Sequence, residues 1–505
     1  REDRLQLQMY IKYRIDKVHT ILGETVTEVA VHLIEYYYAN NTLIDAVMKA
    51  LSKIEGTFGI AVVSSDEPDR IIAARRGSPL ILGIGDDEMI LASDASAIVE
   101  HTRRVIYLED NEMLEITGSE YRGYDLEKNR KNKTVEAIDW DLALIEKQGY
   151  DHFMLKEIHE QPEVVAHTLL GRVASNKVDL SHELDWTAEQ TAGWKKIHFV
   201  ACGTSHYATM VAARIMEELG NFEIRTEVAS EYRYRNIPIG PDTLAVFVSQ
   251  SGETADTLHA ARLAKATGAR CIVVHNVRGS TIHREVGEGL ITPAGPEIGV
   301  AATKTFMAQI TVLTLLGLHL SKMKNELGPE TEHRLVSALM DIPAKLASIL
   351  GREKEIEAIA RNFADARGFF FISRGLAYPP ALEGALKLKE ISYLHAEAYP
   401  AGEMKHGPIA LLDKELPVVA LVPKNDLWEK TVSNIEESMA RNSPIIAIAT
   451  EGDTEIGHYS KNVMFTPDTE PELFPFIAVV PLQLFAYYIP TVSYTHLTLP
   501  TIYPV

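Results

Sequence analysis

The spacing of apolar residues gives the first part of the chain a mixed pattern of helix and strand. Apolar positions recur at helical spacing over residues 26–50. Short apolar runs follow, and Gly, Asp and Pro separate them as turns separate strands. The predicted strands are residues 58–63, 71–74, 80–84, 89–92 and 105–107. This part is therefore predicted to be an α+β block, and the polar run at 127–133 is predicted to be an exposed connector.

The pattern changes further along, where short buried strands alternate with longer helices. Such alternation is typical of βαβ units and a parallel sheet. The predicted strands are residues 197–201, 244–248 and 271–275, and the predicted helices are residues 207–219, 254–266 and 301–320. Residues 369–373 and 418–422 repeat the first two strands at nearly equal distances along the chain. We therefore predict a duplicated α/β domain with doubly wound parallel sheets, which bind ligands at the carboxyl ends of their strands.

Composition narrows the classes of function. The chain carries 50 Lys+Arg and 70 Asp+Glu, a formal net charge of −20, which argues against a nucleic-acid or membrane-surface binder. Cys202 and Cys271 are the two cysteines, which excludes a disulfide framework and argues against a thiolate zinc site. The apolar stretches 307–320 and 474–489 are interpreted as buried core helices. A soluble cytoplasmic protein without a secretory signal is expected.

Two hydroxyl-rich turns follow predicted strands and open predicted helices. They are Ser249–Thr254, with the sequence SQSGET, and Cys202–Ser205, with the sequence CGTS. Free N–H groups and the positive end of a helix dipole favour an anion at such turns, and hydroxyls add donors. The Lys of a nucleotide P-loop is missing, so ATP is not indicated. Simple capping of the helices by Ser or Thr is the alternative, as a buried structural thiol is for Cys202.

A second group of candidates combines charges on one helix face with a loop histidine. Glu383, Lys387 and Glu390 are spaced i, i+4 and i+7 among apolar neighbours. Partial burial would tune their pKa values for proton transfer; a surface salt-bridge ladder is the alternative. His406 lies in the loop GEMKHGP, where a histidine can serve as acid or base or be structural.

Taken together, these segments resemble the glutamine–fructose-6-phosphate aminotransferase family over about residues 24–489. The motifs are ACGTS at Ala201, SQSGETADT at Ser249, EIGVAATK at Glu297, LEGALKLKEISY at Leu382 and AEAYPAGEMKHGP at Ala396. The resemblance implies an N-terminal-nucleophile glutaminase domain, here partial, followed by two sugar-isomerase (SIS) domains. It also implies that ammonia from glutamine reaches fructose 6-phosphate to give glucosamine 6-phosphate, that no cofactor is needed, and that the protein is a homodimer.

The resemblance also implies the domain limits and the site residues. The limits are 1–125 for the partial type-2 glutaminase domain, 126–160 for a linker, and 161–330 and 331–490 for the two SIS domains. Residues 491–505 break the pattern of the apolar helix before them and are interpreted, from that break, as a non-native tail. The implied sugar-phosphate binders are Thr204, Ser205, Ser249, Gln250, Ser251 and Thr254. Val300 matches a backbone contact to the sugar, and Glu390 matches the base that moves a proton between C1 and C2, with Lys387 beside it. His406 matches the ring-opening histidine that the neighbouring subunit supplies.

Three departures from the family pattern change the expectation. The chain begins at Arg1 without the nucleophilic cysteine, Val26 stands where the family usually has an Asp, and the suspected tail replaces the segment with the Schiff-base lysine. We therefore expect no glucosamine 6-phosphate from glutamine and fructose 6-phosphate with this chain as it stands. The rivals are a non-catalytic sugar-phosphate sensor, against which the proton-transfer residues argue, and an ammonia-using isomerase or deaminase, against which the block at 56–117 argues.

Overall fold

The computed structural model describes residues 26–138 except 94, 100 and 119, and residues 147–492 except 221. The chain divides between Glu146 and Lys147 into two compact units, which are described separately. The expectations about residues 1–25 and about the tail beyond residue 492 lie outside the described residues. Val26 and Val492 are the first and last described positions.

The first unit packs two helices against antiparallel sheets. Helix α2 is Val26–Tyr38 and helix α3 is Leu43–Leu51. One sheet has the order β1-β2-β6-β7-β8 and the other the order β4-β3-β5-β9. The strands are β1 Phe58–Ser64, β2 Glu67–Arg76, β3 Ile81–Ile84, β4 Met89–Ala92, β5 Arg104–Tyr107, β6 Glu112–Ile116, β7 Tyr121–Asp125, β8 Arg130–Lys131 and β9 Glu136–Ala137. The α+β prediction is thereby confirmed.

Two details of this unit differ from the prediction. The expected helix over 26–50 is interrupted, because Thr42 has an extended backbone and its hydroxyl accepts the N–H of Asp45 at the start of α3. The expected connector at 127–133 contains β8, which pairs with β7 as an exposed antiparallel hairpin. Its polar residues gave no strand periodicity because neither face of β8 is buried.

The second unit contains two parallel five-stranded sheets with the same connectivity. Their orders are β13-β12-β14-β15-β16 and β18-β17-β19-β20-β21. In the first sheet the strands are β12 Lys196–Ala201, β13 Glu223–Val228, β14 Thr243–Ser249, β15 Arg270–His275 and β16 Gly289–Ile291. In the second they are β17 Gly368–Ser373, β18 His395–Pro400, β19 Val418–Val422, β20 Ile445–Thr450 and β21 Asn462–Thr466. Both sheets follow the doubly wound order 2-1-3-4-5, which confirms the predicted fold class and the duplication.

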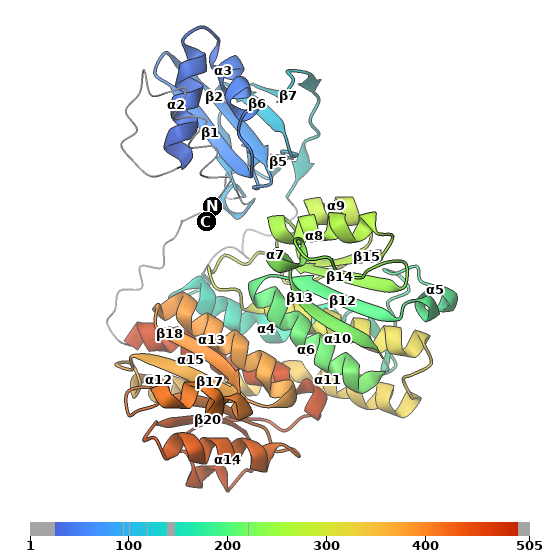
Figure 1. Cartoon of the computed structure of the whole chain (residues 1–505), viewed down its shortest axis with the longest axis vertical. Coiled ribbons are helices and arrows are strands. Elements are labelled where there is room, and N and C mark those ends of the chain that lie inside the picture. The colour runs from blue at the N-terminus through green and yellow to red at the C-terminus, as the bar shows by residue number, and fades with distance from the viewer. Residues whose placement is uncertain are drawn as a thin grey trace. The chain divides into compact units, whose positions relative to one another are not determined.

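Helices cover both faces of each sheet (Figure 1). The first sheet has α7, α8 and α9 on one face and α6 and α10 on the other; the second has α14 on one face and α13 and α15 on the other. The helices are α4 Phe153–Leu169, α5 Ala188–Gly193, α6 Gly203–Leu219, α7 Ala229–Tyr232, α8 Ala255–Ala266, α9 Thr281–Val286, α10 Lys304–Met323, α11 Pro329–Leu350, α12 Glu353–Arg361, α13 Tyr378–Ser392, α14 Trp428–Met439 and α15 Phe474–Val492. A short hairpin of β10 (Val173–Ala174) and β11 (Lys177–Val178) follows α4. One continuous hydrophobic core joins the inner faces of the two sheets through α4, α6, α10, α11, α13 and α15.

Two helical segments in the described part are long and apolar enough to cross a membrane. They are Lys304–Met323 and Pro471–Thr491, of which 89% and 94% of the apolar window is buried inside the protein. The core helix of a soluble protein passes the same test, so these segments are weak evidence for a membrane span. Their burial fits the expectation that both stretches are core helices.

Candidate active site

The two hydroxyl-rich turns lie at the same edge of the first sheet. β12 and β14 are parallel neighbours, with Ala201 opposite Val248, so both strands end at the same level. The turn after β12 leads into α6, whose first turn carries Thr204 and Ser205. The turn after β14 begins at the buried Ser249 and leads into α8. This edge lies at the point where the strand order reverses, the usual ligand site of a doubly wound sheet.

The hydroxyls of the second turn bond to one another and to the turn itself. The Oγ of Ser249 lies 2.9 Å from Oγ1 of Thr254 and accepts the N–H of Gly252 at 3.0 Å. The Oγ of Ser251 accepts the N–H of Glu253 at 3.1 Å. Thr254 occupies the N-cap position of α8 but makes no side-chain capping bond there. The turn is thus shaped by its hydroxyls, while the first N–H groups of α8 keep their capacity to bind an anion.

Gly252 is required by the geometry of this turn. Its φ is +68°, a left-handed conformation that glycine adopts without strain. A Cβ at this position would lie 2.2 Å from Oγ of Ser280 and 2.4 Å from its Cβ. The glycine therefore lets the turn approach the segment that precedes α9.

A buried charge cluster on α13 connects this edge to the second sheet. Nζ of Lys387 lies 2.7 Å from Oε2 of Glu390 and 3.4 Å from Oε1 of Glu383. The ammonium also donates to Oγ1 of Thr204 at 3.0 Å, and the Thr204 hydroxyl donates to Oε1 of Glu383 at 3.2 Å. Thr204 therefore links the anion-binding turn of the first sheet to the charged face of α13, although the residues are distant in sequence.

Burial determines the electrostatics of this cluster. It raises the pKa of Glu383 to about 7, against the opposing influence of the neighbouring Lys387 ammonium. Burial by itself would lower the pKa of Lys387, but the charges of Glu383 and Glu390 outweigh that effect and raise it. Lys387 therefore stays charged at neutral pH. The side chain of Glu390 is 35% exposed, whereas Lys387 and Glu383 are fully enclosed, so Glu390 is the member that a ligand can reach.

The remaining predicted site residues have different surroundings. Ser205 accepts a hydrogen bond from Nε2 of the buried Gln309 on α10 at 3.0 Å. The backbone carbonyl of Gln250 accepts the N–H of Asn276, which fixes the start of its turn. Val300 is 65% exposed on the segment between β16 and α10. Gln309 was missed from sequence, although a polar residue inside such an apolar helix is itself a signal.

His406 lies away from this cluster within the chain. It is exposed at the end of the 3-10 turn Ala401–His406, which follows β18. Ala401 and Met404 of that turn belong to the core on the α14 face of the second sheet, whereas α13 covers the opposite face. In the described residues, no hydrogen bond or ion pair joins His406 to the charges on α13.

Two other candidate chemistries find little support. Burial raises the pKa of the Cys202 thiol, which disfavours the thiolate that a nucleophile needs. Across the part of the chain that the structure describes, no group of three or more His, Cys, Asp or Glu side chains is arranged to hold a metal ion.

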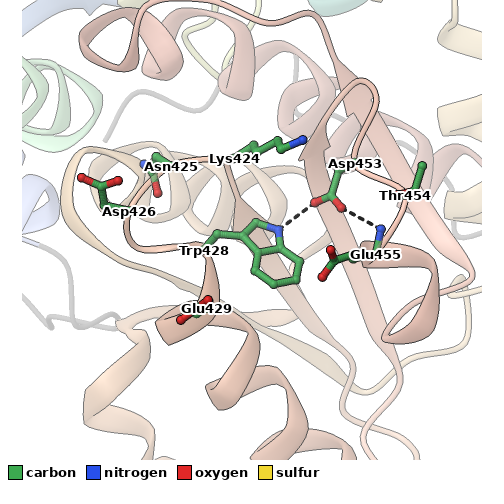
Figure 2. Close-up of a pocket in the computed structure, with 8 residues that line it drawn as sticks. All are labelled: Lys424, Asn425, Asp426, Trp428, Glu429, Asp453, Thr454 and Glu455. Carbon is green, nitrogen blue, oxygen red and sulfur yellow. Dashed lines mark hydrogen bonds between the residues drawn. The ribbon is translucent and has the colours of Figure 1, made fainter.

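A separate pocket lies beyond β19 and β20 of the second sheet (Figure 2). Asp453 accepts the indole N–H of Trp428 at 2.7 Å and the backbone N–H of Glu455 at 3.0 Å. The lining residues are Lys424, Asn425, Asp426, Trp428, Glu429, Asp453, Thr454 and Glu455. The lining carries one lysine and four carboxylates, so its net negative charge disfavours a phosphate group.

Comparisons with known proteins agree with this geometry. The SIS domain family model matches residues 191–318 and 362–492, one match over each parallel sheet. The chain is 45% identical over 474 residues to the glutamine–fructose-6-phosphate aminotransferase (isomerizing) of Chlorobaculum tepidum, covering 93% of this chain and 77% of that protein. It is 44% identical over 471 residues to the enzyme of the same name from Thermus thermophilus, with the same coverage.

Solved structures extend the comparison. The C-terminal domain of glucosamine-fructose-6-phosphate aminotransferase from Francisella tularensis superimposes with a TM-score of 0.66 at 39% identity, covering 70% of this chain and 99% of that one. Tagatose-6-phosphate ketose/aldose isomerase from Escherichia coli superimposes with a TM-score of 0.55 at 18% identity, covering 68% of this chain and 93% of that one, and shares the fold. The fold and the identity over three quarters of its relatives' length show that the chain belongs to the glutamine–fructose-6-phosphate aminotransferase (isomerizing) family.

Proposed function

We propose that the second unit of this chain carries the sugar-phosphate half of its family's reaction, which forms glucosamine 6-phosphate from fructose 6-phosphate with nitrogen taken from glutamine. The observation that carries the proposal is the hydrogen bond of Lys387 to Thr204, because it places the charge cluster that contains Glu390 beside a hydroxyl-rich turn at a helix N-terminus. A sensor of sugar phosphates would need the turns but not the buried charge cluster. The catalytic role therefore explains more of the structure than a binding role does.

The turns after β12 and β14 bind the phosphate group in this proposal. The proposed donors are the backbone N–H groups of the two turns, to which Thr204 and Gln250 belong, and the hydroxyls of Ser205, Ser249, Ser251 and Thr254. Two helix N-termini that meet at one edge attract a dianion without a fixed cation. Val300 is exposed between half-buried and buried neighbours, and in this proposal its backbone contacts the sugar.

Glu390 moves the proton between C1 and C2 of the sugar. Its carboxylate is partly exposed, and its ion pair with Lys387 holds it in place. A carboxylate base of this kind contributes roughly 10²–10⁴-fold to the rate. Lys387 is enclosed, so in this proposal it acts through Glu390, whose carboxylate its ammonium holds in position at 2.7 Å.

The protein acts as a homodimer in this proposal, with His406 completing the site of the neighbouring subunit. The position of His406 on the α14 side of its own sheet supports this, because α13 covers the other side.

We further propose the domain limits. They are 1–125 for a partial glutaminase domain, 126–160 for a linker, 161–330 and 331–490 for the two SIS domains, and 491–505 for a non-native tail. Residues 153–160 of the proposed linker form the start of α4, whose apolar face joins the core of the second unit. We also propose a cytoplasmic protein with neither nucleic-acid nor membrane partners.

Solvent hydrogen exchange tests the proposal. The protein is incubated with fructose 6-phosphate in deuterated buffer, and deuterium incorporated at C1 is followed by NMR. Glu390→Gln is expected to slow the exchange by about 100-fold or more while it binds the sugar with little change. Lys389→Gln, at an exposed position of the same helix, is the matched control and should exchange as the unaltered protein does. Exchange that persists in Glu390→Gln would remove the proposed base.

A further inference from the structure

Glu157 on α4 holds the segment that carries Val300. Its carboxyl oxygen Oε1 accepts the N–H of Ile298 at 2.6 Å and the N–H of Gly299 at 3.0 Å. The side chain is 2% exposed, so these bonds are made inside the protein. Helix α4 thereby fixes the backbone immediately before Val300.

The segment between β16 and α10 is anchored at its far end by its own carboxylate. Oε1 of Glu297 accepts the N–H of Thr303 at 2.8 Å and of Thr305 at 3.1 Å, and its Oε2 accepts the Thr305 hydroxyl. This closes the segment onto the N-terminus of α10. The charge of Glu297 also contributes to raising the pKa of Lys387, so the segment lies within electrostatic reach of the catalytic cluster.

The packing of Gly299 shows how closely Glu157 approaches. A Cβ on Gly299 would lie 2.5 Å from Oε2 of Glu157 and 3.5 Å from the Cα of Met154. Glycine therefore allows the carboxyl group to reach both backbone N–H groups. The residue that follows is Val300, which is exposed where the sugar is proposed to lie.

Glu157 holds the backbone at 298–299 through its carboxyl oxygen Oε1, whether or not the carboxyl group is ionised. Burial, and then the neighbouring Glu297, raise the pKa of Glu157 to about 8 against the opposing influence of Lys304 and of its two backbone bonds. The ammonium of Lys304 itself bonds to Glu160 at 2.6 Å, not to Glu157. Oε2 of Glu157 is buried and has no hydrogen-bond partner in the described residues. A glutamine would keep the accepting oxygen and stay neutral at every pH.

We propose that Glu157 is a positioning residue for the sugar: its carboxyl oxygen holds the backbone at 298–299 so that Val300 contacts the hexose. This inference rests on the proposed function, because it needs a sugar phosphate at the first sheet. The proposal assigns binding of the phosphate group and binding of the hexose to different parts of the protein. The turns after β12 and β14 hold the phosphate, and α4 acts through the 298–300 segment on the hexose alone.

Calorimetric titration of the full chain with two probes, fructose 6-phosphate and inorganic phosphate, tests the inference. Glu157→Ala should weaken fructose 6-phosphate binding by about tenfold, because two buried N–H groups lose their acceptor, and change phosphate binding by less than about twofold. Glu157→Gln should restore sugar binding to nearly the unaltered value. Glu163→Ala, exposed on the same helix, is the matched control and should alter neither affinity.

The outcomes separate this inference from the proposed function. Equal losses for both probes, or unaltered sugar binding in Glu157→Ala, would overturn the positioning role. If Glu157→Ala does not fold, Gly299→Ala decides in its place, since the added methyl group displaces the same carboxyl group and should also weaken sugar binding selectively. If the unaltered protein binds neither probe, or Ser249→Ala binds phosphate normally, the proposed function fails instead.

Discussion

Replacing Lys387 with methionine should make the stability of the second unit strongly dependent on pH. The substitution keeps the length of the side chain and removes the ammonium that lies 2.7 Å from Glu390 and 3.4 Å from Glu383. Glu390 is partly exposed, so water can solvate its charge once Lys387 is gone. Glu383 is fully enclosed and must either hold an unpaired charge or take up a proton.

The magnitude follows from the pKa of Glu383. In the unaltered protein it is raised from 4.5 to about 7, so stability from this group is present below pH 4.5 and is lost as the pH rises to about 7. Above that pH the loss becomes constant, because Glu383 is ionised in both folded and unfolded states. In Lys387→Met the folded pKa rises further, so the loss continues at about 1.4 kcal/mol per pH unit. The free energies of unfolding of the two proteins should therefore differ by a constant amount near pH 6. Near pH 9 this difference should be larger by about 2–3 kcal/mol.

Urea unfolding at several pH values measures this difference. The transition of the second unit is followed by tryptophan fluorescence, since Trp186 and Trp194 lie in its core. The control is the double variant Lys387→Met/Glu383→Gln, which lacks the buried acid of this cluster and should show the same pH dependence as Glu383→Gln. A difference between Lys387→Met and the unaltered protein that stays constant from about pH 6 to pH 9 would refute the reasoning.

Three further predictions concern the turns and the subunits. Gly252→Ala should lower the affinity for inorganic phosphate by at least about tenfold in a calorimetric titration, because its methyl group meets Ser280 in a left-handed backbone; unchanged affinity would contradict the steric argument. His406→Ala and Glu390→Gln should each lose deuterium exchange into fructose 6-phosphate. Co-refolding an equal mixture of the two variants should regain about a quarter of the exchange through hybrid dimers; no recovery would argue that each chain supplies its own histidine. The thiol of Cys202 should react slowly with iodoacetamide near neutral pH, because burial raises its pKa, and fast alkylation in a mass-spectrometric time course would contradict its burial.

Periodicity predicted the sheets because their strands are buried on both faces. The runs at β12, β14 and β19 are continuous and apolar, and such runs are typical of parallel sheets covered by helices. Edge strands lacked that signal. β13, with the sequence EIRTEV, alternates between exposed and half-buried positions, and the sequence pattern did not identify it.

The candidate site was predictable only in pieces. The spacing of Glu383, Lys387 and Glu390 fixes one helix face, and the turn residues fix where hydroxyls gather. The bond between Lys387 and Thr204 joins residues that no local pattern connects, since it depends on how α13 packs against α6. Glu157 was missed for the same reason, because its two bonds reach a segment far along the chain.

The duplicated sheets contribute different chemistry to one site. Hydroxyl-rich turns follow β12 and β14 of the first sheet. In the second sheet, Arg374 follows β17, and its guanidinium donates to Asn434 at 2.8 Å. The second sheet supplies α13 instead, and Lys387 reaches across to Thr204. In the proposed reaction, phosphate binding and proton transfer would therefore fall to separate copies of one fold, which share one core. Because packed cores deform little, such an arrangement would fix a bound sugar relative to Glu390 more firmly than a flexible loop would.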